Sequence, residues 1–231
     1  MNDVSDVGVV FTYWVQPGKE AQSEETMAQI FGAMGEEEFP TGDVKLYTDY
    51  WDPSRPGTRV MLEHFTPAGS SSHATGPKMG QIGRDFTGLM AKPFTRVLLE
   101  PIRTYGFGEA GAGAEERDVK TDVAILADLQ GNYGSDAEIE EVLGEIFDTM
   151  AEEEFSTGNV KAYAMYRDPS LVARYVMYGH YNEAGAAQHA TGPLMREVAA
   201  KLQPLMMLTD SMRLKPVIFA GVGEPISQTR S

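Results

Sequence analysis

The chain has 231 residues, of which 42% are hydrophobic and 23% are charged, and its formal net charge is −15. This composition is typical of a soluble globular protein, and the acidic balance argues against nucleic acid and anionic membranes as partners. The absence of cysteine excludes disulfides, thiolate nucleophiles and cysteine metal sites. The sequence shows neither a signal peptide nor an apolar run long enough to span a membrane, so we expect a cytoplasmic protein.

A tandem duplication organises the sequence. The motif HATGP at 73–77 recurs at 189–193, an offset of 189 − 73 = 116 residues, and the same offset places His64 on His180. The four histidines are therefore two histidines of the first repeat and their two copies in the second. A duplication of this length predicts two domains of ordinary size. We place the first repeat at residues 1–107, a linker at 108–120, the second repeat at 121–223 and a tail at 224–231.

The elements of each repeat are expected to follow one another as strand, helix, strand, strand, helix, strand. In the first repeat these are a strand at 9–15, a helix around 27–34, strands at 44–51 and 59–65 joined by a turn at 52–57, a second helix ending near 91 and a strand at 94–105. This order is ferredoxin-like. In the second repeat, Ser135 followed by Glu138 predicts a capping box at the start of the first helix.

Both faces of the predicted sheets carry apolar residues. Tyr47, Trp51 and Phe65 alternate with Leu46, Tyr50 and Leu62. Because the helices of a ferredoxin-like unit cover only one face, the other face needs a cover as well. We therefore expect an α+β fold in which the two repeats pack face to face as an intrachain pseudo-dimeric barrel. The sequence leaves open whether this pair assembles further into a homo-oligomer.

A set of short motifs occurs at corresponding positions of both repeats. Each repeat has a glycine before a tyrosine-bearing strand, an Asp-Pro turn, and a histidine followed by a Gly-Pro step. These are Gly42, Tyr47, Asp52-Pro53, His73 and Gly76-Pro77 in the first repeat, and Gly158, Tyr163, Asp168-Pro169, His189 and Gly192-Pro193 in the second. Together with Glu63 on the third strand, they resemble the antibiotic biosynthesis monooxygenase family of dimeric α+β barrels over nearly all of both halves.

The resemblance implies a barrel of two such units with a pocket between sheet and helices in each. Some members of the family oxidise phenolic or quinol-type polyketides with molecular oxygen and without metal or flavin. Others degrade haem, and many have no known activity. This chain departs from the family pattern in two ways, because its two units are fused and because Glu63 has Gly179 as its counterpart.

His73 and His189 are the candidate catalytic residues. Each lies just before a Gly-Pro step where a helix stops or restarts, and an imidazole there could accept a proton or orient a polar substrate near neutral pH. The alternative is that each packs at a helix end and bonds a backbone carbonyl. The duplicated run at 36–38 and its copy at 152–154, all glutamate, are interpreted as a solvated face near a helix C-terminus.

The candidate substrate-binding residues are side chains that both repeats keep: Tyr47, Tyr50, His64, Tyr163, Tyr166 and His180. The tyrosines could line a pocket for a flat aromatic ligand, although aromatic residues in strands belong more often to a core. The parity of His64 and His180 with apolar neighbours favours a hydrogen-bonded core or barrel-interface histidine over a ligand. The histidine spacing matches no zinc signature, so we expect no metal.

The sequence as a whole predicts a monooxygenase that needs no cofactor and acts on a small phenolic or quinol-type aromatic molecule. A substrate that can itself reduce oxygen needs deprotonation and positioning, which histidine and tyrosine supply. Two alternatives stay open. One is a non-catalytic barrel that binds a small ligand or serves assembly, and the other is a haem- or metal-binding protein.

Overall fold

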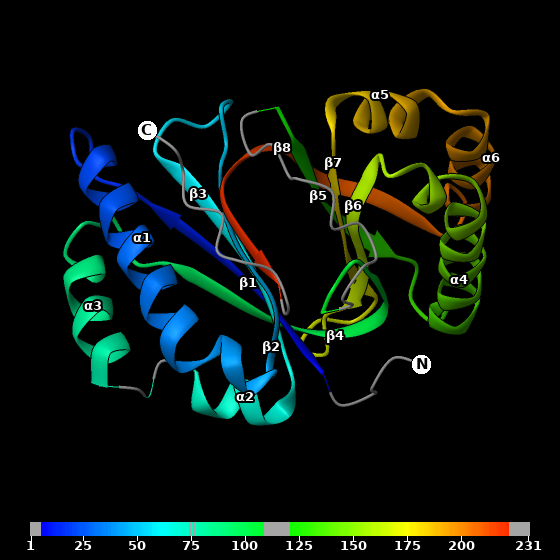
Figure 1. Ribbon diagram of the computed structural model, residues 1–231. Coiled ribbons are helices and arrows are strands. Elements are labelled where there is room, and N and C mark those ends of the chain that lie inside the picture. The colour runs from blue at the N-terminus through cyan, green and yellow to red at the C-terminus, as the bar shows by residue number, and fades with distance from the viewer. Residues whose placement is uncertain (1–5, 74, 76, 109–120, 222–231) are drawn as a thin grey trace. The chain divides into compact units, whose positions relative to one another are not determined.

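The computed structural model describes residues 6–73, 75, 77–108 and 121–221 (Figure 1). Contacts divide the chain into two compact units. Among the described residues, the N-terminal unit comprises 6–98, 107–108 and 215–221, and the C-terminal unit comprises 99–106 and 121–214. The predicted tail and nearly all of the predicted linker lie outside the described residues. Within the described ranges, no helix is long and apolar enough to cross a membrane.

The N-terminal unit contains the first repeat with its helices on one side of an antiparallel sheet (Figure 1). Its elements are β1 (Val7–Trp14), α1 (Glu20–Glu37), the short 3-10 helix η1 (Phe39–Thr41), β2 (Val44–Trp51), β3 (Thr58–Phe65), α2 (Pro67–Ser72) and α3 (Pro77–Thr87). The strand β4 (Thr95–Tyr105) begins in this unit. The hydrogen-bonded order is β1-β3-β2, followed by the last part of β8.

The C-terminal unit repeats this arrangement. Its elements are β5 (Val123–Gly131), α4 (Asp136–Glu153), the 3-10 helix η2 (Phe155–Thr157), β6 (Val160–Arg167), β7 (Arg174–Tyr181), α5 (Glu183–Thr191), α6 (Pro193–Leu202) and β8 (Met206–Gly221). The strand order is β4-β6-β7-β5-β8. The prediction of an α+β fold built from two ferredoxin-like repeats is confirmed, with the second helix of each repeat divided in two.

The compact units differ from the sequence repeats at the fourth strand. Residues Glu100–Tyr105 of β4 pair with β6, and residues Lys215–Gly221 of β8 pair with β2. Each unit therefore takes its last strand partner from the other repeat. These strands are long, with 11 residues in β4 and 16 in β8, so each has room to pair in both sheets.

The first helix of each repeat forms because its apolar residues recur on one face. Met27, Ile30, Phe31 and Met34 of α1 are buried in one core with Tyr47 and Phe65, and Ile139, Leu143, Ile146 and Met150 of α4 are buried in another. Each such side chain contributes roughly 1.5–3 kcal/mol when fully buried. This face places the C-terminal end of α1, at Glu38, over the sheet.

The predicted capping box at Ser135 is wrong. Ser135 has φ −97° and ψ 11°, outside the extended conformation of a typical N-cap, and its side chain makes no capping hydrogen bond. The side-chain caps occur instead at the starts of α2 and α5. The Thr66 hydroxyl accepts from the Gly69 amide at 3.1 Å, and the Asn182 side chain accepts from the Gly185 amide at 2.7 Å.

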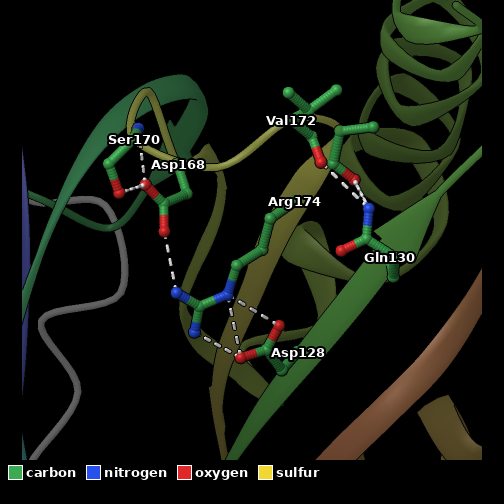
Figure 2. Close-up of polar contacts among 7 residues, drawn as sticks. Asp128, Gln130, Asp168, Ser170, Val172 and Arg174 are labelled. Atoms are coloured by element: carbon green, nitrogen blue, oxygen red, sulfur yellow. Dashed lines mark hydrogen bonds and ion pairs between the residues drawn. The ribbon is translucent and has the colours of Figure 1, made fainter. Parts of the chain in front are cut away.

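A charged network fixes the hairpin between β6 and β7 (Figure 2). Arg174 donates to both carboxylate oxygens of Asp128 through Nε, at 3.0 and 3.1 Å, and through Nη1 to Asp168 Oδ2 at 2.7 Å. The other oxygen of Asp168 accepts from the amide and hydroxyl of Ser170 at 2.8 and 2.6 Å. Burial opposes ionisation, but these bonds outweigh it and lower the pKa of Asp168.

We expect Arg174→Met to lower the free energy of unfolding by about 2–3 kcal/mol, because the buried Asp168 carboxylate would lose its cation. Arg167→Met on the neighbouring strand is the matched control, since its partners Glu100 and Glu140 are exposed. That control should cost less than about 1 kcal/mol. Urea denaturation of both variants measures the difference. Equal losses would mean that the Asp168 contact contributes no more than a surface pair.

Candidate functional site

The N-terminal unit brings His73 between two glutamates. His73 follows α2 directly, and its Nδ1 lies 2.8 Å from Oε2 of Glu38, the residue that ends α1. Its Nε2 lies 4.0 Å from Oε1 of Glu63 on β3. Because Nδ1 is held by Glu38, Nε2 is the nitrogen that can exchange a proton, and Glu63 faces it.

Aromatic rings enclose this histidine. The ring centroid of Phe65 lies 4.9 Å from that of His73, and the centroid of Tyr47 lies 5.9 Å away. The His73 side chain keeps 15% of its surface exposed, whereas Glu63 is only 2% exposed. His73 and Glu38, whose side chain is 13% exposed, are thus the parts of the cluster nearest to the surface, and Glu63 and Tyr47 are more deeply buried.

Burial sets the proton affinity of Glu63. Desolvation raises its pKa to about 7, and the nearby His73, Arg96 and a hydrogen bond with Tyr47 reduce the rise without cancelling it. For His73, burial alone would lower the pKa, but the Glu38 hydrogen bond and the Glu63 charge raise it above 6.5. Burial and the charge of Glu63 also raise the pKa of Tyr47. The cluster therefore exchanges protons near neutral pH, as a general base must.

A second polar cluster lies further along the same face of the sheet. Asp49 is two residues beyond Tyr47 on β2, about 7 Å away along the strand. It accepts a hydrogen bond from the Tyr13 hydroxyl at 2.9 Å, and Arg59 Nη1 lies 3.7 Å from its Oδ2. Arg59 is 6% exposed and donates through Nη2 to Glu24 at 2.8 Å. Desolvation raises the pKa of Asp49 to about 6 although Arg59 and Tyr13 oppose the rise.

The C-terminal unit keeps only part of this arrangement. His189 Nδ1 lies 3.1 Å from Glu154 Oε2, and the rings of Tyr181 and Tyr163 lie 5.0 and 5.9 Å from its ring. Gly179 stands at the position of Glu63, so His189 has no strand carboxylate beside it. The counterparts of Tyr13, Asp49 and Arg59 are Leu129, Met165 and Tyr175. The buried polar face is therefore a property of the N-terminal unit.

The other candidate residues lie apart from these clusters. Tyr50 and His64 alternate with Tyr47 and Glu63 along β2 and β3, which turns them to the opposite face of the sheet. Tyr166 and His180 occupy the same places in the second repeat. His64 Nε2 lies 3.1 Å from Asp6, and His180 Nε2 lies 3.0 Å from Asp122. Both are buried and hydrogen-bonded, as the core interpretation expects.

The interpretation of the glutamate runs as solvated faces is wrong for their last members. Glu38 and Glu154 turn inward and bond His73 and His189, each across 35 residues of sequence. The signal was available, because each run stands at the same distance before its histidine in both repeats. No local sequence rule predicts this contact. It depends on how the end of α1 or α4 meets the histidine, which comes directly after α2 in the first repeat and lies within α5 in the second.

Two further features bear on ligand binding. In the described part of the chain, no group of three or more histidine, aspartate or glutamate side chains is placed to hold a metal ion. A cavity of about 330 Å³ lies on the C-terminal unit between α4 and α6. Its lining residues are Glu145, Ile146, Thr149, Glu153, Pro193, Glu197 and Lys201. Because this lining lacks a histidine and its lysine is already bonded to Glu145, we centre the candidate site on His73 instead.

The fold is monooxygenase-like. No family model and no curated protein matches the sequence, but solved structures share its fold. A "putative monooxygenase" from Fusobacterium nucleatum has a TM-score of 0.82 at 12% identity, with 99% of this chain and 100% of that chain covered. Another of that description from Lactobacillus acidophilus has a TM-score of 0.78 at 11% identity, with coverages of 96% and 99%. An "anthrone oxidase-like protein" has a TM-score of 0.52 at 9% identity, with coverages of 96% and 95%.

Proposed function

We propose that this chain is a cofactor-independent monooxygenase that oxidises a small, electron-rich aromatic molecule of the phenol or quinol type at the His73 cluster. The observation that carries the proposal is the pairing of a partly exposed imidazole with a buried carboxyl whose pKa is about 7. The monooxygenase-like fold supports the reaction type, and the solved structure described as anthrone oxidase-like supports an aromatic substrate.

The chemistry begins with a proton. His73 Nε2 takes the proton of a substrate hydroxyl or activated ring C–H, and the negative charge of Glu63 stabilises the imidazolium. Glu38 holds the opposite ring nitrogen and so fixes the orientation of the base. The resulting electron-rich anion reduces molecular oxygen. One oxygen atom forms the new carbonyl of the substrate, and the other leaves as water with two hydrogens from the substrate, so atoms and electrons balance.

Tyr47 and Phe65 contribute shape to this site. Both rings border His73, and a flat aromatic ligand packs well against such walls. The proposal therefore assigns the substrate-binding role to Tyr47 and the base to His73. Tyr163 and His189 stand at the corresponding positions of the second repeat, without a counterpart of Glu63, and the proposal gives them no role.

Oxygen uptake by the purified protein with a panel of phenols, naphthols and anthrones tests this function. We expect turnover whose kcat/KM rises with pH, because the base His73 must be unprotonated and its pKa lies above its ordinary value. His73→Ala should lower kcat by about 100-fold or more. Glu20→Ala, at the opposite end of α1 from Glu38, is the control and should leave kcat near the wild-type value. Saturable binding of the panel without oxygen uptake would favour the non-catalytic alternative.

A further inference from the structure

Two neighbouring positions on the third strand differ between the repeats in a complementary way. The N-terminal unit has Glu63 and Phe65, and the C-terminal unit has Gly179 and Tyr181. A Cβ atom on Gly179 would lie 2.2 Å from the Tyr181 hydroxyl oxygen and 2.4 Å from its ring. Real Cβ atoms do not approach other atoms this closely, so a side chain at 179 and this placement of Tyr181 exclude each other.

The ring and the hydroxyl of Tyr181 both occupy this space, because its ring carbons Cε2 and Cζ come within 2.4 Å of that Cβ position. The rings of Phe65 and Tyr181 lie at similar centroid distances from their histidines, 4.9 and 5.0 Å. Phe65 stands beside a residue that has a Cβ, however, so its ring cannot lean over Glu63 as the ring of Tyr181 leans over Gly179. Tyr181 thus fills the room that the glutamate occupies in the other repeat.

The surroundings of Tyr181 have lost the corresponding polar contact. Tyr47 in the N-terminal unit has a hydrogen bond with Glu63. Its counterpart Tyr163 has a buried hydroxyl with no hydrogen-bond partner among the described residues. A buried hydroxyl without a hydrogen-bond partner lowers the free energy of unfolding. The C-terminal cluster keeps the His189–Glu154 pair but has no second carboxylate to stabilise an imidazolium.

We infer that each chain has one working site, the His73 cluster, and that Tyr181 closes the corresponding site of the second repeat. Positions 179 and 181 together decide whether a repeat can carry the carboxylate that faces the histidine. This inference rests on the proposed function for its catalytic part. Its structural part, the mutual exclusion of a side chain at 179 and this placement of the Tyr181 ring and hydroxyl, does not.

A substitution cycle tests the exclusion without any substrate. Gly179→Glu should lower the urea midpoint strongly, and Tyr181→Phe alone should change it little. Because the first repeat holds Glu63 beside Phe65, the double variant can adopt that arrangement and should regain at least half of the loss. Tyr178→Phe, on the opposite face of the same strand, is the control and should not rescue Gly179→Glu. A double variant no more stable than Gly179→Glu would overturn the assignment of Tyr181.

Turnover tests the catalytic part with the phenol and anthrone panel. His73→Ala should lower oxygen uptake by about 100-fold or more, His189→Ala should lower it much less, and the double variant Gly179→Glu/Tyr181→Phe in the His73→Ala background should restore part of it. Equal losses in the two histidine variants would overturn the single-site inference. If no protein consumes oxygen with any panel member, the proposed function fails, while the stability cycle still decides the role of Tyr181.

Discussion

Raising the pH from 4.5 to 8 is expected to lower the free energy of unfolding by about 3 kcal/mol through Glu63 alone. The folded chain holds the Glu63 pKa at about 7, against an ordinary value of 4.5, chiefly because the carboxyl is buried. Between these values the folded state binds a proton that the unfolded state has released, so stability falls as the pH rises. The magnitude follows from roughly 1.4 kcal/mol for each unit of difference in pKa.

Glu63→Gln isolates this effect, because the amide keeps the shape of the carboxyl and does not ionise. Urea denaturation at a series of pH values should show a steeper decline for the wild type than for the variant. The raised pKa of His73 acts in the same direction, so part of the decline should survive in Glu63→Gln and shrink further when His73→Asn is added. The decline that then remains includes the share of Asp49, whose pKa is also raised. Parallel profiles for wild type and Glu63→Gln would show that Glu63 ionises in the folded protein as it does in water.

Replacing Arg59 with methionine is expected to cost about 3 kcal/mol of stability at pH 7, because the substitution leaves Asp49 buried without its cation. Asp49 is only 1% exposed and already has a pKa of about 6. It can therefore take up a proton when Arg59 is lost, which keeps the cost at the lower end for a broken buried pair. The contact of Arg59 with Glu24 adds little, since that carboxylate is exposed.

The second repeat supplies the control for this prediction. Met165 and Leu129 stand where Asp49 and Tyr13 stand, and they pack against the helices without any charge. We expect Asp49→Met in the Arg59→Met background to recover most of the lost stability, because no buried charge is then left alone. Chemical denaturation of the two single variants and the double variant measures the coupling. Additive losses would show that Asp49 and Arg59 do not depend on each other.

Local patterns in the sequence predicted the repeats and the order of their elements. The helical spacing from Met27 to Met34 and the alternation along 44–51 depend only on neighbouring residues, and both elements are present in the structure. The division of β4 and β8 between two sheets was not predictable in this way, because periodicity identifies a strand without identifying its partner. The failed capping box at Ser135 shows the same limit, since backbone angles decide whether a hydroxyl can reach an amide.

Part of the candidate site could be predicted from the sequence. His73 and Tyr47 were recognisable because both repeats keep them, and the structure brings them together. Glu38 was misjudged because its contact crosses 35 residues. The difference between Glu63 and Gly179 was visible in the sequence. The accompanying difference between Phe65 and Tyr181 could be interpreted only from the structure, where the Tyr181 side chain lies over Gly179.

Each compact unit contains strand residues from the other repeat, which limits the deletions that this chain can tolerate. Without residues 215–221, the edge of β2 would lose its hydrogen-bonding neighbour and would present a bare strand to other molecules. A gene cut after residue 107 should therefore yield an aggregating or self-pairing fragment, which light scattering would detect. On the single-site inference the second repeat has no catalytic role, but it cannot be deleted, because its residues 215–221 pair with β2.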